Sequence, residues 1–285
     1  MKQRVISGIV LALILIPTWW FLADTWIFDV FFSLLAAFAC FELTRCIKLP
    51  SKEMQIVAIL FAFVLPLGVV YNAIIPTPAI IVVYIIFLLF MTVIKYPDVK
   101  FEHLAGTIYA SVIIPLAFAM APIIQNFYKT YKDIDKAECK FFIWYVVAAA
   151  LFTDVFAQLS GMAFGKHKMT PELSPKKTWE GAIGGVICAL LLNLLWLLIY
   201  MKTPLFATNP ELPFPIWFYC LLSPIVSIAS MFGDLIASLI KRNYDIKDYS
   251  NLIPGHGGIM DRFDSVLMVM PMFYALITIY ESVVL

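Results

Sequence analysis

Charged residues are scarce in this sequence, and neither sign of charge is in excess. Only 14% of the 285 residues are Asp, Glu, Lys or Arg, and the formal net charge is +1. Soluble globular domains contain about 25% charged residues, so the composition is unlike that of a soluble protein. A nucleic-acid-binding protein favours a strongly basic surface, so no nucleic-acid partner is expected.

Clustered cysteines and histidines are also lacking. The five cysteines are scattered along the chain and form no CxxC pair. A structural zinc site or a disulfide framework is therefore not expected. Because the chain has only three histidines, any bound metal is expected to be a hard cation held by oxygen ligands.

Apolar residues, by contrast, are abundant. They make up 62% of the chain, and the mean hydropathy is +0.92. A membrane-spanning helix needs about 20 mainly apolar residues. Segments of about that length lie at roughly 4–23, 27–42, 55–74, 78–95, 104–125, 141–164, 179–201, 215–240 and 262–283.

These segments predict an all-α, polytopic integral membrane protein with about nine transmembrane helices. No soluble domain or long linker is left over, so residues 1–285 are expected to form a single transmembrane domain. Within it, 1–140 would hold the N-terminal spans and 141–285 the catalytic C-terminal half. We interpret the N-terminal apolar run as a retained first span, because no A-x-A-like cleavage site follows it closely.

Lysine and arginine indicate the orientation of the spans. They gather before the first span and after the second, fourth, sixth and eighth, which places them all on one side. The positive-inside rule makes that side cytoplasmic. The loop 126–140 disagrees, because it holds four lysines on the predicted outside: Lys129, Lys132, Lys136 and Lys140.

One stretch, residues 238–264, concentrates ionisable residues between two apolar segments. It reads SLIKRNYDIKDYSNLIPGHGGIMDRFD. Burying unpaired charge in hydrocarbon is costly, so such a cluster indicates a site. A solvated cytoplasmic loop would explain its basic residues, but not the interleaved acids or the glycines. Cations, carboxylates and backbone N–H groups together predict phosphate bound with a divalent metal.

Four aspartates are candidate ligands for that metal. Asp154 lies inside the sixth span and Asp234 inside the eighth, while Asp261 and Asp264 are three residues apart where the ninth span begins. A helix-packing seam is the alternative for Asp154, and helix capping is the alternative for Asp261 and Asp264. Asp234, Asp261 and Asp264 at one membrane face suit Mg²⁺, which prefers carboxylates with substrate phosphate and water.

The glycine-rich turn at 254–258 is expected to contribute to phosphate binding. Gly257 and Gly258 let backbone N–H groups approach a phosphate closely. His256, which lies between two glycines of this turn, is equally suited to donate to a phosphate or to cap the turn.

The loop at 165–181 supplies further candidates. Lys176 and Lys177 would bind phosphate, or would serve only as positive-inside anchors. Ser174 and Thr178 are both placed to cap the span that follows.

The motif in residues 238–264 resembles the signature of the phosphatidate cytidylyltransferases, also called CDP-diacylglycerol synthases. The matching positions are Ser238, Lys241-Arg242, Lys247-Asp248, Ser250, Pro254, His256-Gly257-Gly258, Asp261-Arg262 and Asp264. The segment from Asp154 through Phe164-Gly165-Lys166 to Gly181 is also similar to that family. The N-terminal spans resemble it only in being hydrophobic.

This resemblance implies the reaction of CTP with phosphatidic acid to give CDP-diacylglycerol and pyrophosphate. It implies Mg²⁺ dependence, with a second metal such as K⁺ left open. It also implies a multi-pass homodimer, in contact with membrane lipid, in the bacterial inner membrane, with its active-site loops facing the cytoplasm. The lipid phosphate oxygen is already anionic at neutral pH, so catalysis would rest on positioning and charge stabilisation.

Hypothetical roles follow for the residues named above. The residues expected to act in catalysis are Asp261, Lys241, Arg242, Asp264 and His256. Those expected to bind substrate are Ser174, Lys176, Lys177, Arg262, Gly257, Gly258 and Ser238. Those expected to hold metal are Asp234, Asp261 and Asp154.

Two other classes of protein would use similar residues. A polytopic lipid-alcohol kinase would transfer the γ-phosphoryl group and release a nucleoside diphosphate. A secondary transporter would use Asp154 and Asp234 as coupling-ion sites, but such proteins often contain internal repeats, and none is visible in this sequence.

Overall fold

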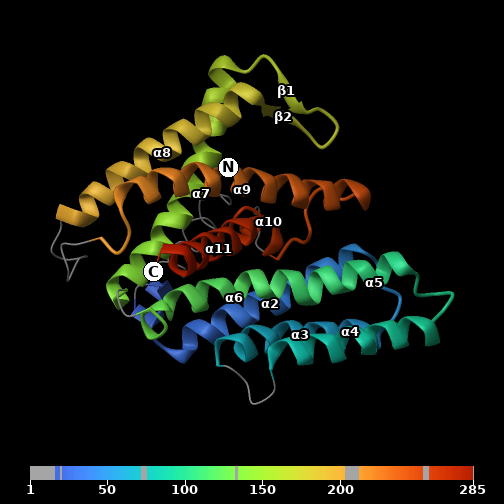
Figure 1. Ribbon diagram of the computed structural model, residues 1–285. Coiled ribbons are helices and arrows are strands. Elements are labelled where there is room, and N and C mark those ends of the chain that lie inside the picture. The colour runs from blue at the N-terminus through green and yellow to red at the C-terminus, as the bar shows by residue number, and fades with distance from the viewer. Residues whose placement is uncertain are drawn as a thin grey trace. The chain divides into compact units, whose positions relative to one another are not determined.

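The structure is a computed structural model that describes residues 17–19, 21–71, 76–131, 134–202, 212–252 and 257–284 (Figure 1). Eight helices in this part of the chain are long and apolar enough to cross a membrane. The prediction of an all-α, multi-pass membrane protein is therefore confirmed. The first predicted span, 4–23, lies mostly outside the described residues.

Contacts divide the chain into two compact units. Unit 1 comprises Met1–Ile123 and Lys241–Phe263, and unit 2 comprises Ile124–Ile240 and Asp264–Leu285. The units are interleaved along the sequence, because each contains two separate segments of chain. The expectation of one domain with a catalytic half after residue 140 stays a prediction.

Unit 1 contains the first helices of the described chain. In order they are α2 (Trp26–Cys46), α3 (Lys52–Val70), α4 (Thr77–Ile94), α5 (Phe101–Ile108), the π-helical η1 (Tyr109–Ile113) and most of α6 (Ile114–Gln125). The span predicted at 104–125 is thus one helical run with a π-helical turn inside it. The short α10 (Met260–Phe263) also belongs to this unit.

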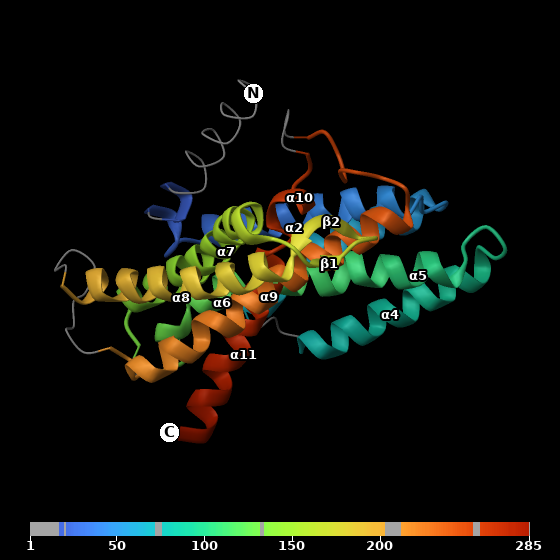
Figure 2. The same cartoon turned by 90° about the horizontal axis from the view of Figure 1, so that it is seen from above.

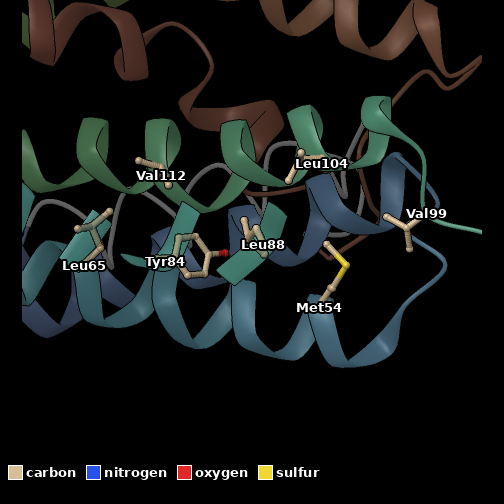
Figure 3. Packing of buried hydrophobic residues seen from close by; sticks show 7 residues of the cluster. All are labelled: Met54, Leu65, Tyr84, Leu88, Val99, Leu104 and Val112. Carbon is tan, nitrogen blue, oxygen red and sulfur yellow. The ribbon is translucent and has the colours of Figure 1, made fainter. Parts of the chain in front are cut away.

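The core of unit 1 lies where α3, α4 and α5 pack together, and Figure 2 shows α4 running beside α5. Figure 3 shows the buried cluster formed by Met54, Leu65, Tyr84, Leu88, Val99, Leu104 and Val112. The Tyr84 hydroxyl donates to the Ser111 hydroxyl at 2.8 Å, which satisfies the one polar tip in this cluster. α3 also packs against α2, so this core supports that helix.

Unit 2 is built around α7 (Lys136–Phe164) and α8 (Trp179–Lys202). Figure 1 shows the hairpin of β1 (Lys168–Thr170) and β2 (Ser174–Thr178) connecting these two helices. A Cβ on Gly181 would lie 2.6 Å from the Ala157 carbonyl oxygen, so α8 approaches α7 at a distance that only glycine allows. Small residues at such crossings are typical of membrane helices. The remaining elements are η2 (Phe127–Lys129), α9 (Ile216–Asn243), which continues into unit 1, and α11 (Val266–Val284).

The predicted ninth span, 262–283, differs from the structure at its start. The chain forms α10, leaves the helix at Asp264 and Ser265, and resumes as α11. The Asp264 carboxylate accepts the Ser265 N–H at 2.8 Å, and this local bond competes with helix continuation. Asp261 and Asp264 therefore do not lie on one helix face, as a continuous helix would have required.

Candidate functional site

The predicted site residues are divided between the two units. Those in unit 1 are Lys241, Arg242, Gly257, Gly258, Asp261 and Arg262. Those in unit 2 are Asp154, Ser174, Lys176, Lys177, Asp234, Ser238 and Asp264. His256 lies outside the described residues.

Asp261 is the centre of the contacts in unit 1. Its side chain is 3% exposed, and its Oδ1 accepts a hydrogen bond from the Lys241 ammonium at 2.8 Å. Its Oδ2 accepts from the backbone N–H groups of Tyr249 at 2.8 Å and Gly258 at 3.0 Å. A buried carboxylate is costly unless it is paired and hydrogen-bonded, and these three donors meet that requirement. We call Lys241, Tyr249, Gly258 and Asp261 the Asp261 cluster.

A second buried carboxylate in unit 1, Glu42, was not among the predicted site residues. It lies near the C-terminal end of α2 and is 2% exposed. Its Oε1 accepts from the Ser250 hydroxyl at 2.5 Å and from the Ile259 N–H at 3.0 Å. Its Oε2 accepts from the Met260 N–H at 2.9 Å. The sequence does contain a signal for Glu42. A carboxylate at the end of an apolar span is a candidate functional residue, because charge beside hydrocarbon is costly.

Glycine is required next to both carboxylates. Gly257 has φ +83°, a left-handed conformation that glycine adopts without strain. A Cβ on Gly258 would overlap the Glu42 carboxylate. Phosphate binding by the two glycines stays a prediction, and the structure gives an independent reason for glycine at each position.

The two arginines of the motif are both exposed. The Arg242 guanidinium donates to the Ile246 carbonyl at 3.4 Å, and Arg262 lies in α10. Tyr244 lies between them in sequence, and burial raises the pKa of its hydroxyl above the ordinary value. Tyr244 therefore adds no negative charge beside the two guanidinium groups, which are charged and accessible to an anion.

Asp234 forms the corresponding ion pair in unit 2. Its Oδ2 lies 2.7 Å from the Lys177 ammonium, and the two side chains are 35% and 24% exposed, respectively. The ammonium also approaches the Met231 carbonyl at 3.4 Å, and the Ser238 hydroxyl lies 3.5 Å from Asp234 Oδ1. The structure thus joins a predicted metal ligand to a predicted phosphate-binding lysine.

Asp154 belongs to the same group. It lies on α7, about 15 Å along the axis from the end of the helix. Its Oδ2 accepts from the Ser265 hydroxyl at 3.2 Å, and its charge interacts with that of Asp234. The Lys177 ammonium acts on both carboxylates and offsets part of their mutual repulsion. We call Asp154, Lys177, Asp234 and Ser265 the Asp234 cluster.

The β1–β2 hairpin positions Lys177. Glu180, in the first turn of α8, accepts from the N–H groups of Lys166 at 3.1 Å and His167 at 3.2 Å, and it lies 2.6 Å from the His167 Nδ1. Thr178 caps the same helix by accepting the Gly181 N–H at 3.2 Å. The hairpin is therefore fixed at its base.

The two predicted lysines of the hairpin differ in their surroundings. Lys177 is half-buried and pairs with Asp234, whereas its neighbour Lys176 is exposed. Burial increases towards the end of β2, from exposed Lys176 to half-buried Lys177 and buried Thr178. Ser174, also half-buried, begins β2 and pairs with Thr170 in the sheet.

The residues fit a divalent metal in part. Within the described residues, no group of three or more His, Cys, Asp or Glu side chains is arranged to hold a metal ion. Asp154 and Asp234 supply two carboxylates, the ligand type that Mg²⁺ combines with substrate phosphate and water. At Asp261 a cation would first have to displace the Lys241 ammonium from Oδ1. A metal role for Asp261 stays a prediction.

Comparisons with known proteins agree along the whole chain. A sequence profile described as the cytidylyltransferase family matches residues 2–280. A phosphatidate cytidylyltransferase of Bacillus subtilis is 30% identical over 286 residues, covering 99% of this chain and 99% of that protein. One from Staphylococcus haemolyticus is 38% identical over 48% of each chain. One from Haemophilus influenzae is 41% identical over 47% of this chain and 44% of its own.

Proposed function

The chain belongs to the cytidylyltransferase family, and from this premise we propose that it transfers the cytidylyl group of CTP to phosphatidic acid. The products are CDP-diacylglycerol and pyrophosphate. The observation that carries the proposal is the similarity over the whole chain to a phosphatidate cytidylyltransferase. Neither the lipid-alcohol kinase nor the transporter gains support from these relatives.

The reaction needs little proton transfer. An oxygen of the lipid phosphate attacks the α-phosphorus of CTP, and the bond from that phosphorus to the oxygen bridging to the β-phosphate breaks. Pyrophosphate leaves with the bonding electron pair. Because a phosphate monoester has its second pKa at about 6, the attacking oxygen is already anionic at pH 7 and requires no general base.

Charge stabilisation is then the main task of the protein. Both substrates are polyanions, so cations must offset their mutual repulsion before they can react. Lys177 and Lys241 are each paired with an aspartate, which fixes the position of the ammonium group. Arg242 and Arg262, together with Lys176, are exposed cations that suit phosphate oxygens.

The metal proposal is Mg²⁺ held by Asp154 and Asp234. When bound there, Mg²⁺ would supply positive charge to the triphosphate oxygens. The Lys177 ammonium occupies one side of the Asp234 carboxylate and would remain available to a phosphate. The predicted second metal, K⁺, has no assigned ligand and stays a prediction.

Location and assembly follow from the substrates and relatives. CTP is a cytoplasmic metabolite, so the β1–β2 hairpin and the loop before α10 are proposed to face the cytoplasm. Lysine and arginine in the connecting loops support this orientation. The bacterial relatives support an inner-membrane location. A homodimer is proposed from the family resemblance alone.

The test uses the full chain, purified in mixed micelles with phosphatidic acid, Mg²⁺ and CTP labelled in its α-phosphate. We expect label in the lipid fraction, and we expect EDTA to abolish its transfer. ATP labelled in its γ-phosphate, with a long-chain alcohol, is the control for a kinase. Label that reaches only the alcohol, or no labelled lipid under any condition, would overturn the proposed function.

A further inference from the structure

We propose that Glu42 is a positioning residue for this reaction, which holds the segment from Gly257 to Asp261 in the conformation that forms the Lys241–Asp261 pair. The effect on catalysis rests on the proposed function. The effect on the segment rests only on contacts within unit 1. Nothing in the motif of residues 238–264 points to this residue, because it lies on α2, 217 residues before Ile259.

Two carboxylates divide the backbone donors of this segment between them. The N–H groups of Tyr249 and Gly258 donate to Asp261. Those of Ile259 and Met260 donate to Glu42. The two carboxylates therefore hold consecutive residues of one segment. Glu42 holds Ile259 and Met260, which directly precede Asp261, and Asp261 holds Gly258, which precedes Ile259.

Both oxygens of Glu42 are engaged by backbone N–H groups. Oε1 accepts from Ile259 and Oε2 from Met260, and Ser250 adds its hydroxyl to Oε1. Charge-assisted hydrogen bonds of this kind are stronger than neutral ones. A glutamine in this place cannot reproduce them, because either orientation of its amide sets an NH₂ group against an N–H donor. Glu42 and glutamine have nearly the same shape, so this change separates hydrogen bonding from packing.

The position of Glu42 also explains Gly258. Since a Cβ at residue 258 would overlap the Glu42 carboxylate, Gly258→Ala and Glu42 are coupled. Shortening the acid by one methylene in Glu42→Asp opens space for that Cβ. The two substitutions together are therefore expected to lose less activity than the product of their separate effects.

The experiment measures local hydrogen exchange and kinetics in Glu42→Gln and Glu42→Asp. Exchange is followed by mass spectrometry on peptides covering 257–263 of the purified full chain. We expect exchange there to be about tenfold faster in Glu42→Gln, since hydrogen bonds to a charged acceptor are lost. We expect kcat/KM for CTP to fall about 100-fold, since small displacements of catalytic groups have effects of that size. Glu42→Asp keeps the charge and should recover part of both.

Asp29→Asn is the matched control. Asp29 is another buried carboxylate of α2, 7% exposed, and it accepts a hydroxyl donor from Tyr71 at 2.5 Å. It lies about 20 Å along the helix from Glu42. Its substitution should lower the melting temperature while leaving exchange at 257–263 and kcat/KM as in the wild type.

Wild-type exchange and kinetics in Glu42→Gln would overturn the proposal. So would a loss of activity that follows the melting temperature equally in Glu42→Gln and Asp29→Asn, because Glu42 would then only stabilise the fold. If the wild-type chain makes no CDP-diacylglycerol, the proposed function fails. The exchange measurement still decides whether Glu42 holds the segment.

Discussion

At the scale of single residues, the two lysine–aspartate pairs differ in their burial. In unit 1 the side chains of Lys241 and Asp261 are 14% and 3% exposed, whereas in unit 2 those of Lys177 and Asp234 are 24% and 35% exposed. Removing one partner of a buried pair leaves an uncompensated charge, which costs about 3–5 kcal/mol. Breaking a more exposed pair costs at most about 1 kcal/mol. Loss of Lys241 alone is therefore expected to destabilise the fold, whereas the second pair is accessible to a ligand.

Lys241→Met and Lys177→Met are expected to separate these effects. Lys241→Met should lower both activity and the free energy of unfolding, the latter by about 3 kcal/mol, because Asp261 stays buried without its cation. Lys177→Met should reduce kcat/KM for CTP at least tenfold, since a phosphate-binding charge is lost, while stability changes by less than about 1 kcal/mol.

Both variants are measured by melting temperature in detergent and by CTP kinetics, with Lys202→Met as a control at an exposed lysine of α8. Equal destabilisation by Lys241→Met and Lys177→Met would contradict the distinction. Normal kinetics in Lys177→Met would show that Lys177 does not bind a substrate phosphate.

The sequence predicted which residues gather in the motif, but not how they pair. The motif predicts catalytic roles for both Lys241 and Asp261, but their mutual contact depends on the path of the chain between them. The sequence does not identify Glu42, because hydropathy marks it only as the end of a span and carries no information on contacts between distant residues.

At the scale of elements, the length of each apolar segment predicts most of the membrane-spanning helices. The helices depart from these predictions where a local polar hydrogen bond interrupts them. The predicted spans at 78–95 and 179–201 match α4 and α8 within a residue or so at each end. The break between α10 and α11 was not predicted, because it depends on one aspartate bonding to the next N–H. The sequence predicts a loop at 165–181, where the structure has the β1–β2 hairpin; strands of three and five residues are too short for an alternating pattern to be visible.

Glu180 is expected to control the hairpin. Glu180→Ala removes the acceptor of the Lys166 and His167 N–H groups and should free the base of the hairpin from α8. We expect faster trypsin cleavage after the hairpin lysines and a KM for CTP raised several-fold, because Lys177 is no longer held in place.

Glu172→Ala is the control, since Glu172 is an exposed glutamate in the turn of the same hairpin. Cleavage that is unchanged in Glu180→Ala would show that the strand pairing alone fixes the hairpin.

At the scale of the whole molecule, the chain alternates between two units, and hydropathy did not predict this. It gives the length of each span but not its partners. The proposed orientation is a property of the same scale, and it rests on loops whose charges agree except at 126–140.

Cysteine labelling tests the orientation. We expect Glu172→Cys, in the hairpin, to react with a membrane-impermeant maleimide only in inverted vesicles, and Thr130→Cys, in the loop after η2, only in intact spheroplasts. Both residues are exposed, and the native cysteines are first replaced. Labelling of the two positions from the same side would contradict the proposed topology.

The distance along the chain between Glu42 and its donors also sets the order in which the protein is completed on the ribosome. α2 is synthesised early, whereas Ser250, Ile259 and Met260 follow 208, 217 and 218 residues after Glu42. Until they emerge, the acid at the end of α2 lacks these three donors, and an unsatisfied carboxylate beside hydrocarbon is costly. A chain that stalls before residue 250 therefore keeps an unsatisfied carboxylate at the end of α2, which distinguishes it from the finished protein.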